Sequence, residues 1–344
     1  MNDCHDFWGP MKICILGNIN GFADEAQKNI TRRISAELSR KFAVTFQEAK
    51  GNLVNPGFWK DLRTRPPDII HVFLRPTATV LLYVGLLRRF CRQSRVILSV
   101  LQPPGMPASL TGLLSFAGPH LLITSSHRLS EYFARGQSPT VTLYGGVDRD
   151  KFQPVSPEAK AARRRQHQLP LNRFLLLHVG HPTPGRNLGI FTENLGDDVT
   201  AVLVLSRAPA AANPLIRELK EAGCLVLAGY RENLQELYQL ADGYVFPTLR
   251  AANAVGLPLS VLEAMACNLP VLSTRFGALP ELFAEDPGFR YFDGTAPDLR
   301  AQAAELRAGA TPCANREKTA SLDWREMAGC LEAVYHRLLQ GGLP

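Results

Sequence analysis

Residues that could form a binding site are concentrated between positions 241 and 282. A β-rich run at 243–246 is followed by a loop broken by Gly256, and then by an expected helix over 259–266. The order of strand, loop and helix then repeats, so two loops and two helix N-termini should meet at the carboxyl edge of one parallel sheet. Helix N-termini favour phosphate, and Glu263 adds a carboxylate near one of them. This edge is therefore predicted to bind a ligand.

The role of Glu263 has two interpretations. Ser260 precedes it by three residues, which is the spacing of a capping box, so Ser260 is predicted to be the N-cap of the helix. Glu263 would then serve only the helix. Alternatively, its two carboxylate oxygens could accept hydrogen bonds from a vicinal diol of a ligand. The two roles are compatible.

A resemblance to a known family rests on residues 255–271, which read V-G-L-P-L-S-V-L-E-A-M-A-C-N-L-P-V. This stretch resembles the signature of the group 1 (family-4) glycosyltransferases, E-G-x-P-x-S-x-L-E-A-M-A-x-G-x-P-V. The resemblance implies the GT-B fold, an α/β architecture in which two Rossmann-like domains face each other across a cleft. Two positions depart. Asn268 replaces a glycine and can still end a helix, whereas Val255 replaces the first of the family's two glutamates.

A second phrase supports the resemblance. Residues 179–188, V-G-H-P-T-P-G-R-N-L, align without gaps with the family phrase V-G-R-L-x-x-x-K-N-L. Arg186 thus takes the place of a lysine, and His181 that of an arginine. A departing nucleoside diphosphate gains negative charge that fixed cations stabilise; Arg186 keeps its charge, and His181 carries one only when protonated. The plainer alternative makes Arg186 an ordinary loop cation.

The resemblance also implies which residues meet the nucleotide. Glu263 matches the glutamate that binds the ribose hydroxyls, and Tyr230 and Arg231 fall where the base would rest. Arg186, His181 and Glu263 are therefore expected to be catalytic. The nucleotide-binding group would be completed by positions in the glycine loops and the loop before Glu263, namely Gly21, Gly180, Gly256, Leu257 and Leu259.

No metal or resident cofactor is expected. Asp197 and Asp198 form no D-x-D motif, and no His/Cys cluster has ligand spacing. The co-substrate would be a nucleotide-diphospho-sugar, with a UDP-sugar as the first choice. The expected partners are this nucleotide sugar and a carbohydrate, lipid-linked or small-molecule acceptor.

Three departures fall where the family's chemistry lies, at His181, Val255 and Leu101, the last in place of a histidine. Valine cannot accept a hydrogen bond from a sugar hydroxyl, and an unpaired buried polar group costs about 1–3 kcal/mol. Two interpretations follow. One is a retaining, metal-independent glycosyltransferase that moves a hexosyl or related group. The other is a catalytically degenerate GT-B protein that serves as a binding partner or scaffold. Arg186 and Glu263 favour the enzyme, and a sugar-nucleotide epimerase fits the motifs less well.

Strand-like and helical segments alternate along the chain, as in parallel sheets covered by helices. Residues 141–154 resemble the linker phrase of the family. The resulting prediction is an acceptor domain over 1–155, a donor domain over 156–323 and an amphipathic helix over 324–344 that crosses back toward the first domain. Ser156 is a predicted N-cap, because Pro157 follows it.

Composition limits the class of protein. The chain has 344 residues, 46% hydrophobic and 20% charged, which suits two soluble globular domains. Seven cysteines without a C-x-x-C pair, and no signal pattern, predict a cytoplasmic protein with reduced thiols. The net charge of +7 includes arginine clusters such as Arg88-Arg89, which form either solvated faces or a surface for anionic lipid at the inner membrane. Nucleic acid is not expected, because aromatic residues do not interleave with the arginines.

Overall fold

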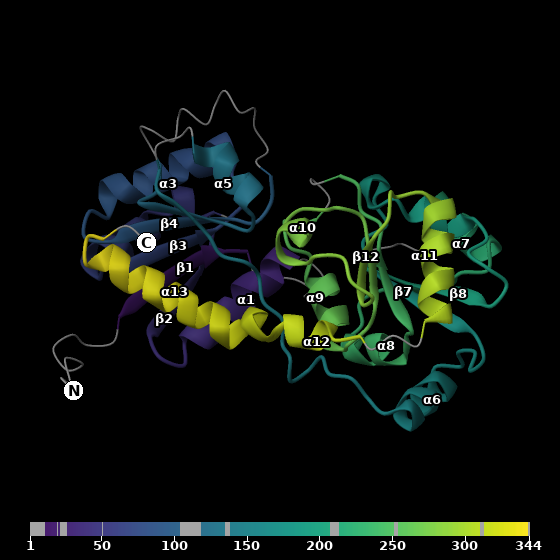
Figure 1. Cartoon of the computed structure of the whole chain (residues 1–344). Helices are drawn as coiled ribbons and strands as arrows, with labels where there is room; N and C mark the ends of the chain where they lie inside the picture. Colours follow the sequence, from purple (N-terminus) through teal and green to yellow (C-terminus); the bar gives the residue numbers. More distant parts are fainter. Residues whose placement is uncertain are drawn as a thin grey trace, which may run out of the picture. The chain divides into compact units, whose positions relative to one another are not determined.

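The computed structural model describes residues 11–18, 20, 26–49, 51–103, 118–134, 138–206, 213–250, 254–309 and 313–342. The chain divides into two compact units, one made of residues 1–145 and 324–344 and the other of residues 146–323. Each unit contains a parallel six-stranded sheet flanked by helices, which confirms the predicted α/β class (Figure 1).

The first unit has the strand order β2-β1-β3-β4-β5-β6. Its strands are β1 (Lys12–Gly17), β2 (Ala43–Glu48), β3 (Ile69–Phe73), β4 (Arg95–Val100), β5 (Leu121–Thr124) and β6 (Thr140–Thr142). Its helices are α1 (Ala26–Leu38), η1 (Asn52–Val54), α2 (Pro56–Thr64), α3 (Ala78–Phe90), α5 (His127–Ala134) and α13 (Trp324–Leu339). Every residue of β3 and β5 is buried, because helices cover both faces of the sheet (Figure 1).

The C-terminal helix α13 belongs to this first unit and packs against α1. Its expected apolar positions are buried, namely Met327, Leu331, Val334 and Leu338. A buried polar group also fixes it. The Nδ1 atom of His71 on β3 lies 2.6 Å from the Tyr335 hydroxyl on α13, and its Nε2 atom lies 2.7 Å from the Ser99 hydroxyl on β4. Both ring nitrogens are therefore satisfied without a charge.

This histidine makes the first unit sensitive to acid. Burial lowers the pKa of His71 to about 3, whereas an unfolded histidine has a pKa near 6.5. The unfolded chain binds the proton more tightly, so the stability from neutral His71 is complete above about pH 6.5 and declines as the pH falls toward 3. Between pH 7 and pH 5 we expect a loss of about 2 kcal/mol from this group. Urea unfolding followed by tryptophan fluorescence measures it, because all three tryptophans belong to the first unit.

A His71→Phe variant is the control for this pH dependence. It is expected to be less stable than the parent at pH 7, because the Tyr335 and Ser99 hydroxyls lose their shared partner. Its unfolding midpoint should nevertheless change less between pH 7 and pH 5. An equal change in parent and variant would assign the acid sensitivity to other groups.

The second unit has the strand order β12-β11-β10-β7-β8-β9. Its strands are β7 (Phe174–Gly180), β8 (Val199–Leu205), β9 (Leu225–Ala228), β10 (Gly243–Phe246), β11 (Val271–Ser273) and β12 (Phe289–Tyr291). Its helices are α6 (Pro157–Gln166), η3 (Pro184–Arg186), η4 (Leu188–Thr192), α7 (Pro214–Glu221), α8 (Leu234–Leu240), α9 (Leu259–Ala266), α10 (Leu279–Leu282), α11 (Ala296–Ala308), α12 (Asn315–Lys318) and η6 (Ala320–Leu322). Counted from β7, this is the Rossmann order 3-2-1-4-5-6, and its switch point lies between β7 and β10.

The division between the units falls after Gly145 rather than after residue 155. The backbone N–H of Val147 donates to Leu322 O at 2.8 Å, and the Arg316 guanidinium donates to Phe152 O at 2.7 Å. These bonds attach the linker phrase to the end of the second unit. The cap at Ser156 is confirmed, since its hydroxyl accepts from the backbone N–H of Ala159.

Each cysteine within the described part of the chain is a free thiol. Among the helices in those ranges, none is both long and apolar enough to cross a membrane.

Candidate functional site

The candidate site lies at the carboxyl ends of β7 and β10, where the strand order reverses. The loop after β7 and the loop after β10 are joined by their backbones, because the N–H groups of Leu249 and Arg250 both donate to Gly185 O, at 3.1 and 3.3 Å. The Thr274 hydroxyl at the end of β11 donates to Thr248 O at 2.6 Å. Three neighbouring strand ends thus form one connected edge.

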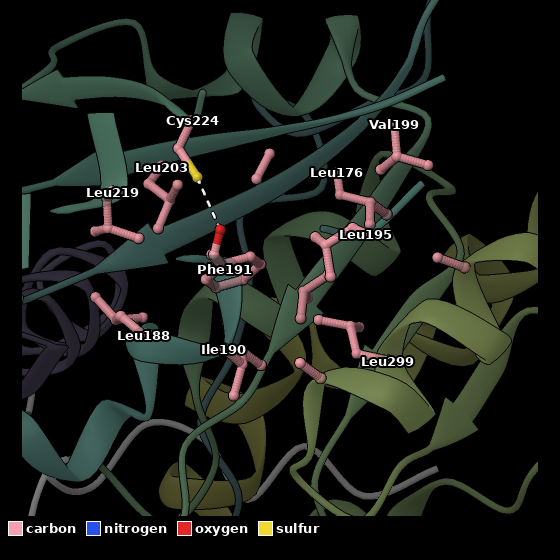
Figure 2. Close-up of a cluster of buried hydrophobic side chains, with 14 of the residues drawn as sticks. Leu176, Leu188, Ile190, Phe191, Leu195, Val199, Leu203, Leu219, Cys224 and Leu299 are labelled. Atoms are coloured by element: carbon pink, nitrogen blue, oxygen red, sulfur yellow. Dashed lines mark hydrogen bonds between the residues drawn. The ribbon is translucent and has the colours of Figure 1, made fainter. Parts of the chain in front are cut away.

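The loop that carries Arg186 is anchored by hydrophobic side chains that follow it directly. Leu188, Ile190 and Phe191 of η4 are buried in a core built with residues of the sheet and of helices α7 and α11 (Figure 2). The Cys224 thiol donates to Phe191 O at 3.1 Å (Figure 2). This packing of the residues after Arg186 can hold Arg186 in one position.

Arg186 is a buried cation. The residue is only 9% exposed, and its Nε atom has no hydrogen-bond partner. Its guanidinium carbon lies 5.8 Å from the Phe246 ring centroid. No carboxylate of the described residues lies within ion-pair distance of it. Burial lowers the pKa of Arg186, but a guanidinium keeps its proton in proteins. A buried charge without a counter-ion is costly, and an anion at this position would offset that cost.

Gly180 makes room for this guanidinium. A Cβ atom at position 180 would lie 3.1 Å from Arg186 Nη1 and 2.9 Å from His178 Nε2. His178 is fully buried, and its Nδ1 atom lies 2.9 Å from Val245 O. Burial, more than the neighbouring Arg186 charge, lowers the pKa of His178 to about 3, so the ring is neutral. Gly180, a predicted nucleotide-binding position, lies beside Arg186, and His178 is an addition that the motifs did not indicate.

Glu263 lies on α9, but the predicted capping box is wrong. The helix begins at Leu259 with Pro258 as N-cap, and no side chain caps it. The Ser260 hydroxyl is instead hydrogen-bonded to the side chain of Tyr244, and Glu263 accepts a 2.7 Å bond from the Tyr238 hydroxyl. These tertiary partners outcompete the local cap. The positive end of the helix is thus left without a capping side chain, which suits an anion.

The loop before α9 is held by its backbone. Gly256 O accepts from the N–H of Ala278 at 2.9 Å, and Gly277, with φ +54°, lies directly against it. The side chains of Val255 and Leu257 are 2% and 1% exposed. Val255 is thus a core residue and offers no polar atom from its side chain.

The close approach of Gly277 to Gly256 gives a testable prediction. A Cβ atom at position 277 would lie 2.0 Å from Gly256 O, so Gly277→Ala must displace the loop that starts α9. We expect ligand affinity at this site to fall at least about tenfold, because small misplacements of site groups are costly. Gly223→Ala is the matched control: its φ is +85°, but a Cβ there meets nothing within 4 Å. It should cost about 1 kcal/mol of stability and leave affinity unchanged. Equal affinity in the parent and Gly277→Ala would contradict the argument.

His181, Tyr230 and Arg231 lie farther along the same edge. His181 Nδ1 is 2.9 Å from the hydroxyl of Ser206, which directly follows β8. Tyr230, 46% exposed, and the exposed Arg231 follow the outer strand β9. Three interstrand spacings, about 14 Å, separate β9 from β10, so Tyr230 and Arg231 lie at the outer end of the edge, three strands away from the strand that leads to the helix of Glu263. Gly21 lies outside the described residues.

The motifs also missed two buried tyrosines, Tyr238 and Tyr244, whose rings are 5.7 Å apart. They link Glu263 on α9 to the strand that borders Arg186. Their only signal in the sequence is a phenol within an otherwise apolar segment, which usually seeks a polar partner when buried. Within the described ranges, no three His, Cys, Asp or Glu side chains gather in a metal-binding arrangement.

Comparisons with known proteins show what this chain is similar to. A family model described as "Glycosyl transferases group 1" matches residues 175–307, the range that contains Arg186 and Glu263. The putative teichuronic acid biosynthesis glycosyltransferase of Bacillus subtilis is 30% identical over 173 residues, 48% of this chain and 41% of the relative. The D-inositol 3-phosphate glycosyltransferase of Segniliparus rotundus is 27% identical over 240 residues, 62% of this chain and 50% of the relative. The matches thus span half or less of these relatives.

Solved structures match over the whole length. Anabaena HepE, crystallised with UDP, has a TM-score of 0.76 at 17% identity and covers 95% of this chain and 100% of its own. Sucrose-phosphate synthase of Thermosynechococcus elongatus has a TM-score of 0.76 at 16% identity, with 96% and 100% covered. The chain therefore has the GT-B fold of two Rossmann-like domains, and residues 175–307 of its second unit match the model of the group 1 glycosyl transferases.

Proposed function

We propose that the protein is a retaining, metal-independent glycosyltransferase that moves a hexosyl or related group from a nucleotide-diphospho-sugar to an acceptor. The observation that carries this proposal is Arg186, a buried guanidinium without a carboxylate partner among the described residues, at the switch point of a Rossmann sheet. A diphosphate would supply the missing negative charge. Arg186 would then stabilise the charge that develops as the glycosyl bond breaks, without a metal ion.

The other site residues have defined roles in this proposal. The uncapped N-terminus of α9, at Leu259, would face the diphosphate, and Gly180, Gly256 and Leu257 would bring backbone close to it. Glu263 would accept hydrogen bonds from the ribose hydroxyls. His181, beside Ser206, would add a second donor. Tyr230 and Arg231 would contact the base.

A UDP-sugar is the first candidate donor. The solved structures of Anabaena HepE contain UDP, UDP with glucose, or UDP-glucose, and the starch synthase IV of Arabidopsis thaliana contains ADP with acarbose. Both bases therefore belong in a test. No resident cofactor is part of the proposal. Val255 is buried where the family has a glutamate, so the donor sugar must be held by other groups.

The test is a panel of UDP-, GDP- and ADP-sugars, each assayed for binding and for release of the free diphosphate, with Glu263→Ala as the control. We expect one nucleotide sugar to bind and to release its diphosphate slowly, and both signals to be lost in the variant. Turnover should be unchanged by a metal chelator. Proton NMR of the product should show the anomeric configuration of the donor. Binding without turnover under any of these conditions would instead favour the scaffold interpretation, to which Val255 points.

We also propose that the acceptor is met at the inner surface of a membrane, as a lipid-linked saccharide. The support is a surface of the first unit defined here by Leu82, Phe90, Arg89 and Arg92. The two apolar side chains are 59% and 58% exposed, and both arginines are exposed. Leu82, Arg89 and Phe90 share one face of α3 by helical spacing. Apolar side chains beside cations are typical of surfaces that bind anionic lipid.

Vesicle sedimentation tests this contact. The parent should bind phosphatidylcholine vesicles that contain phosphatidylglycerol and should not bind vesicles without it. Replacing Arg89 and Arg92 with glutamine should weaken binding about fivefold per charge. The matched control replaces Arg217 and Lys220, two exposed cations on α7 of the second unit. If both double variants lose vesicle binding equally, the binding depends only on net charge and the proposed surface is wrong. If the protein instead self-associates through Leu82 and Phe90, this surface contacts a second copy of the chain and not a membrane.

A further inference from the structure

A buried tyrosine holds the carboxylate of Glu263. The Tyr238 hydroxyl on α8 donates to Glu263 Oε2 on α9 at 2.7 Å, although the two residues are 25 positions apart. Tyr238 is fully buried, whereas Glu263 is half-buried. The bond therefore connects a side chain in the interior of the second unit to Glu263, which is partly accessible at the candidate site.

The tyrosine itself is fixed by aromatic neighbours. Its ring makes an edge contact with Phe152, with centroids 5.6 Å apart, and lies 5.7 Å from the ring of Tyr244. Burial, followed by the nearby charge of Glu263, raises the pKa of Tyr238 well above its ordinary value. The phenol is therefore protonated under all working conditions and acts toward Glu263 as a hydrogen-bond donor.

This bond restricts how Glu263 can meet a ligand. A free glutamate side chain explores many rotamers, and it loses that freedom when it binds a diol. With Oε2 bonded to Tyr238, the position of one carboxylate oxygen is restricted before the ligand arrives. Each carboxylate oxygen has two lone pairs, so the bond to Tyr238 leaves acceptor capacity for hydroxyl groups. Preorganisation of this kind increases affinity by lowering the cost of ordering.

We propose that Tyr238 is a positioning residue that orients Glu263 toward the cis-diol of a ribose, so that the pair selects ribonucleotides over deoxyribonucleotides. This inference rests on the proposed function, since it assigns Glu263 to the sugar of the nucleotide. It names the chemical feature that the site reads, two vicinal hydroxyl groups. It also gives a reason for the tyrosine beyond the packing of α8 against α9.

The test compares UDP with 2′,3′-dideoxy-UDP by calorimetry in the parent and in Tyr238→Phe, with GDP or ADP and their dideoxy forms used where the panel identifies that base. The phenylalanine keeps the ring and removes one donor. We expect UDP affinity to fall about tenfold, the value of a hydrogen bond to a charged group, and the affinity for the dideoxy form to change less than about twofold. In a Glu263→Gln background, Tyr238→Phe should change UDP affinity less than about twofold, because the two residues act together.

Tyr244→Phe is the matched control. It removes a hydroxyl from the neighbouring buried ring, whose oxygen lies 3.5 Å from Val179 O rather than on Glu263. Its preference for UDP over the dideoxy form should equal that of the parent. An equal fall in both affinities for Tyr238→Phe would show a purely structural tyrosine and overturn the inference while the proposed function stands. Absence of nucleotide binding in the parent would overturn both.

Discussion

Replacing Arg186 with glutamine is expected to lower the rate of sugar-nucleotide cleavage by about 10²–10³, the usual effect of removing one group that stabilises transition-state charge. The physical reason is its placement: the guanidinium is buried, lacks a carboxylate among the described residues and lies at the switch point of the sheet. Release of the diphosphate under single-turnover conditions measures the effect. Arg186→Lys should retain most of the rate, because it keeps the positive charge.

Stability provides a second measurement on the same variant. A buried charge without a partner costs free energy, so Arg186→Gln should unfold at the same temperature as the parent or at a higher one. Arg217→Gln is the control, since Arg217 is 74% exposed on α7 and should affect neither quantity. A rate within about threefold of the parent for Arg186→Gln would remove Arg186 from the proposed chemistry.

The largest loss of stability is expected from Asp242→Ala. At the opposite, amino edge of the sheet, Asp242 accepts from Lys160 Nζ at 2.7 Å, from Arg164 Nη2 at 2.5 Å and from the N–H of Leu175 at 2.7 Å. Arg164 is buried and also donates to Leu240 O. Removing the Asp242 carboxylate leaves the positive charge of Arg164 unpaired, which costs about 3–5 kcal/mol of stability. Urea unfolding followed by circular dichroism measures this, because the second unit has no tryptophan.

Two further variants separate the ion pair from simple loss of a charge. Asp198 also pairs with an arginine, Arg307, at 2.5 Å, but the two side chains are 56% and 51% exposed. Asp198→Ala should therefore cost less than about 1 kcal/mol. Adding Arg164→Met to Asp242→Ala should recover part of the loss, since the unpaired charge is then removed. Equal costs for Asp242→Ala and Asp198→Ala would refute the argument from burial.

The same cluster changes the interpretation of an arginine-rich segment. The run at 163–165 contributes to the basic character of the chain, yet Arg164 is committed to Asp242. It is not available to a polyanion. Arg89 and Arg92, in contrast, are exposed on or beside α3. Net charge alone could not distinguish the two groups, because the difference lies in burial.

Some helices and strands can be predicted from local sequence patterns. The strand at 243–246 and the helix at 259–266 have the predicted bounds, and the helix predicted over 324–344 begins at Trp324 and ends at Leu339, because each has its own hydrophobic period and its own breakers. Helices α2, α7 and α11 were missed. Each begins with a capping side chain, from Asn55, Asn213 or Thr295, and has a proline at its first or second position, and that pair of signals could have found them.

Local patterns of residues are sufficient to predict the α/β class, the glycine loops at the carboxyl edge, Arg186 in one of these loops and Glu263 on the helix after another, because these features depend on residues close together in the chain. The tertiary structure decided what those side chains meet. The order β10-β7-β8 brings the Arg186 loop against the loop after β10, and the packing of α8 on α9 brings Tyr238 to Glu263. Ser260 bonds Tyr244 rather than capping its own helix for the same reason. Contacts between distant segments depend on sheet order and helix packing, which no local pattern encodes.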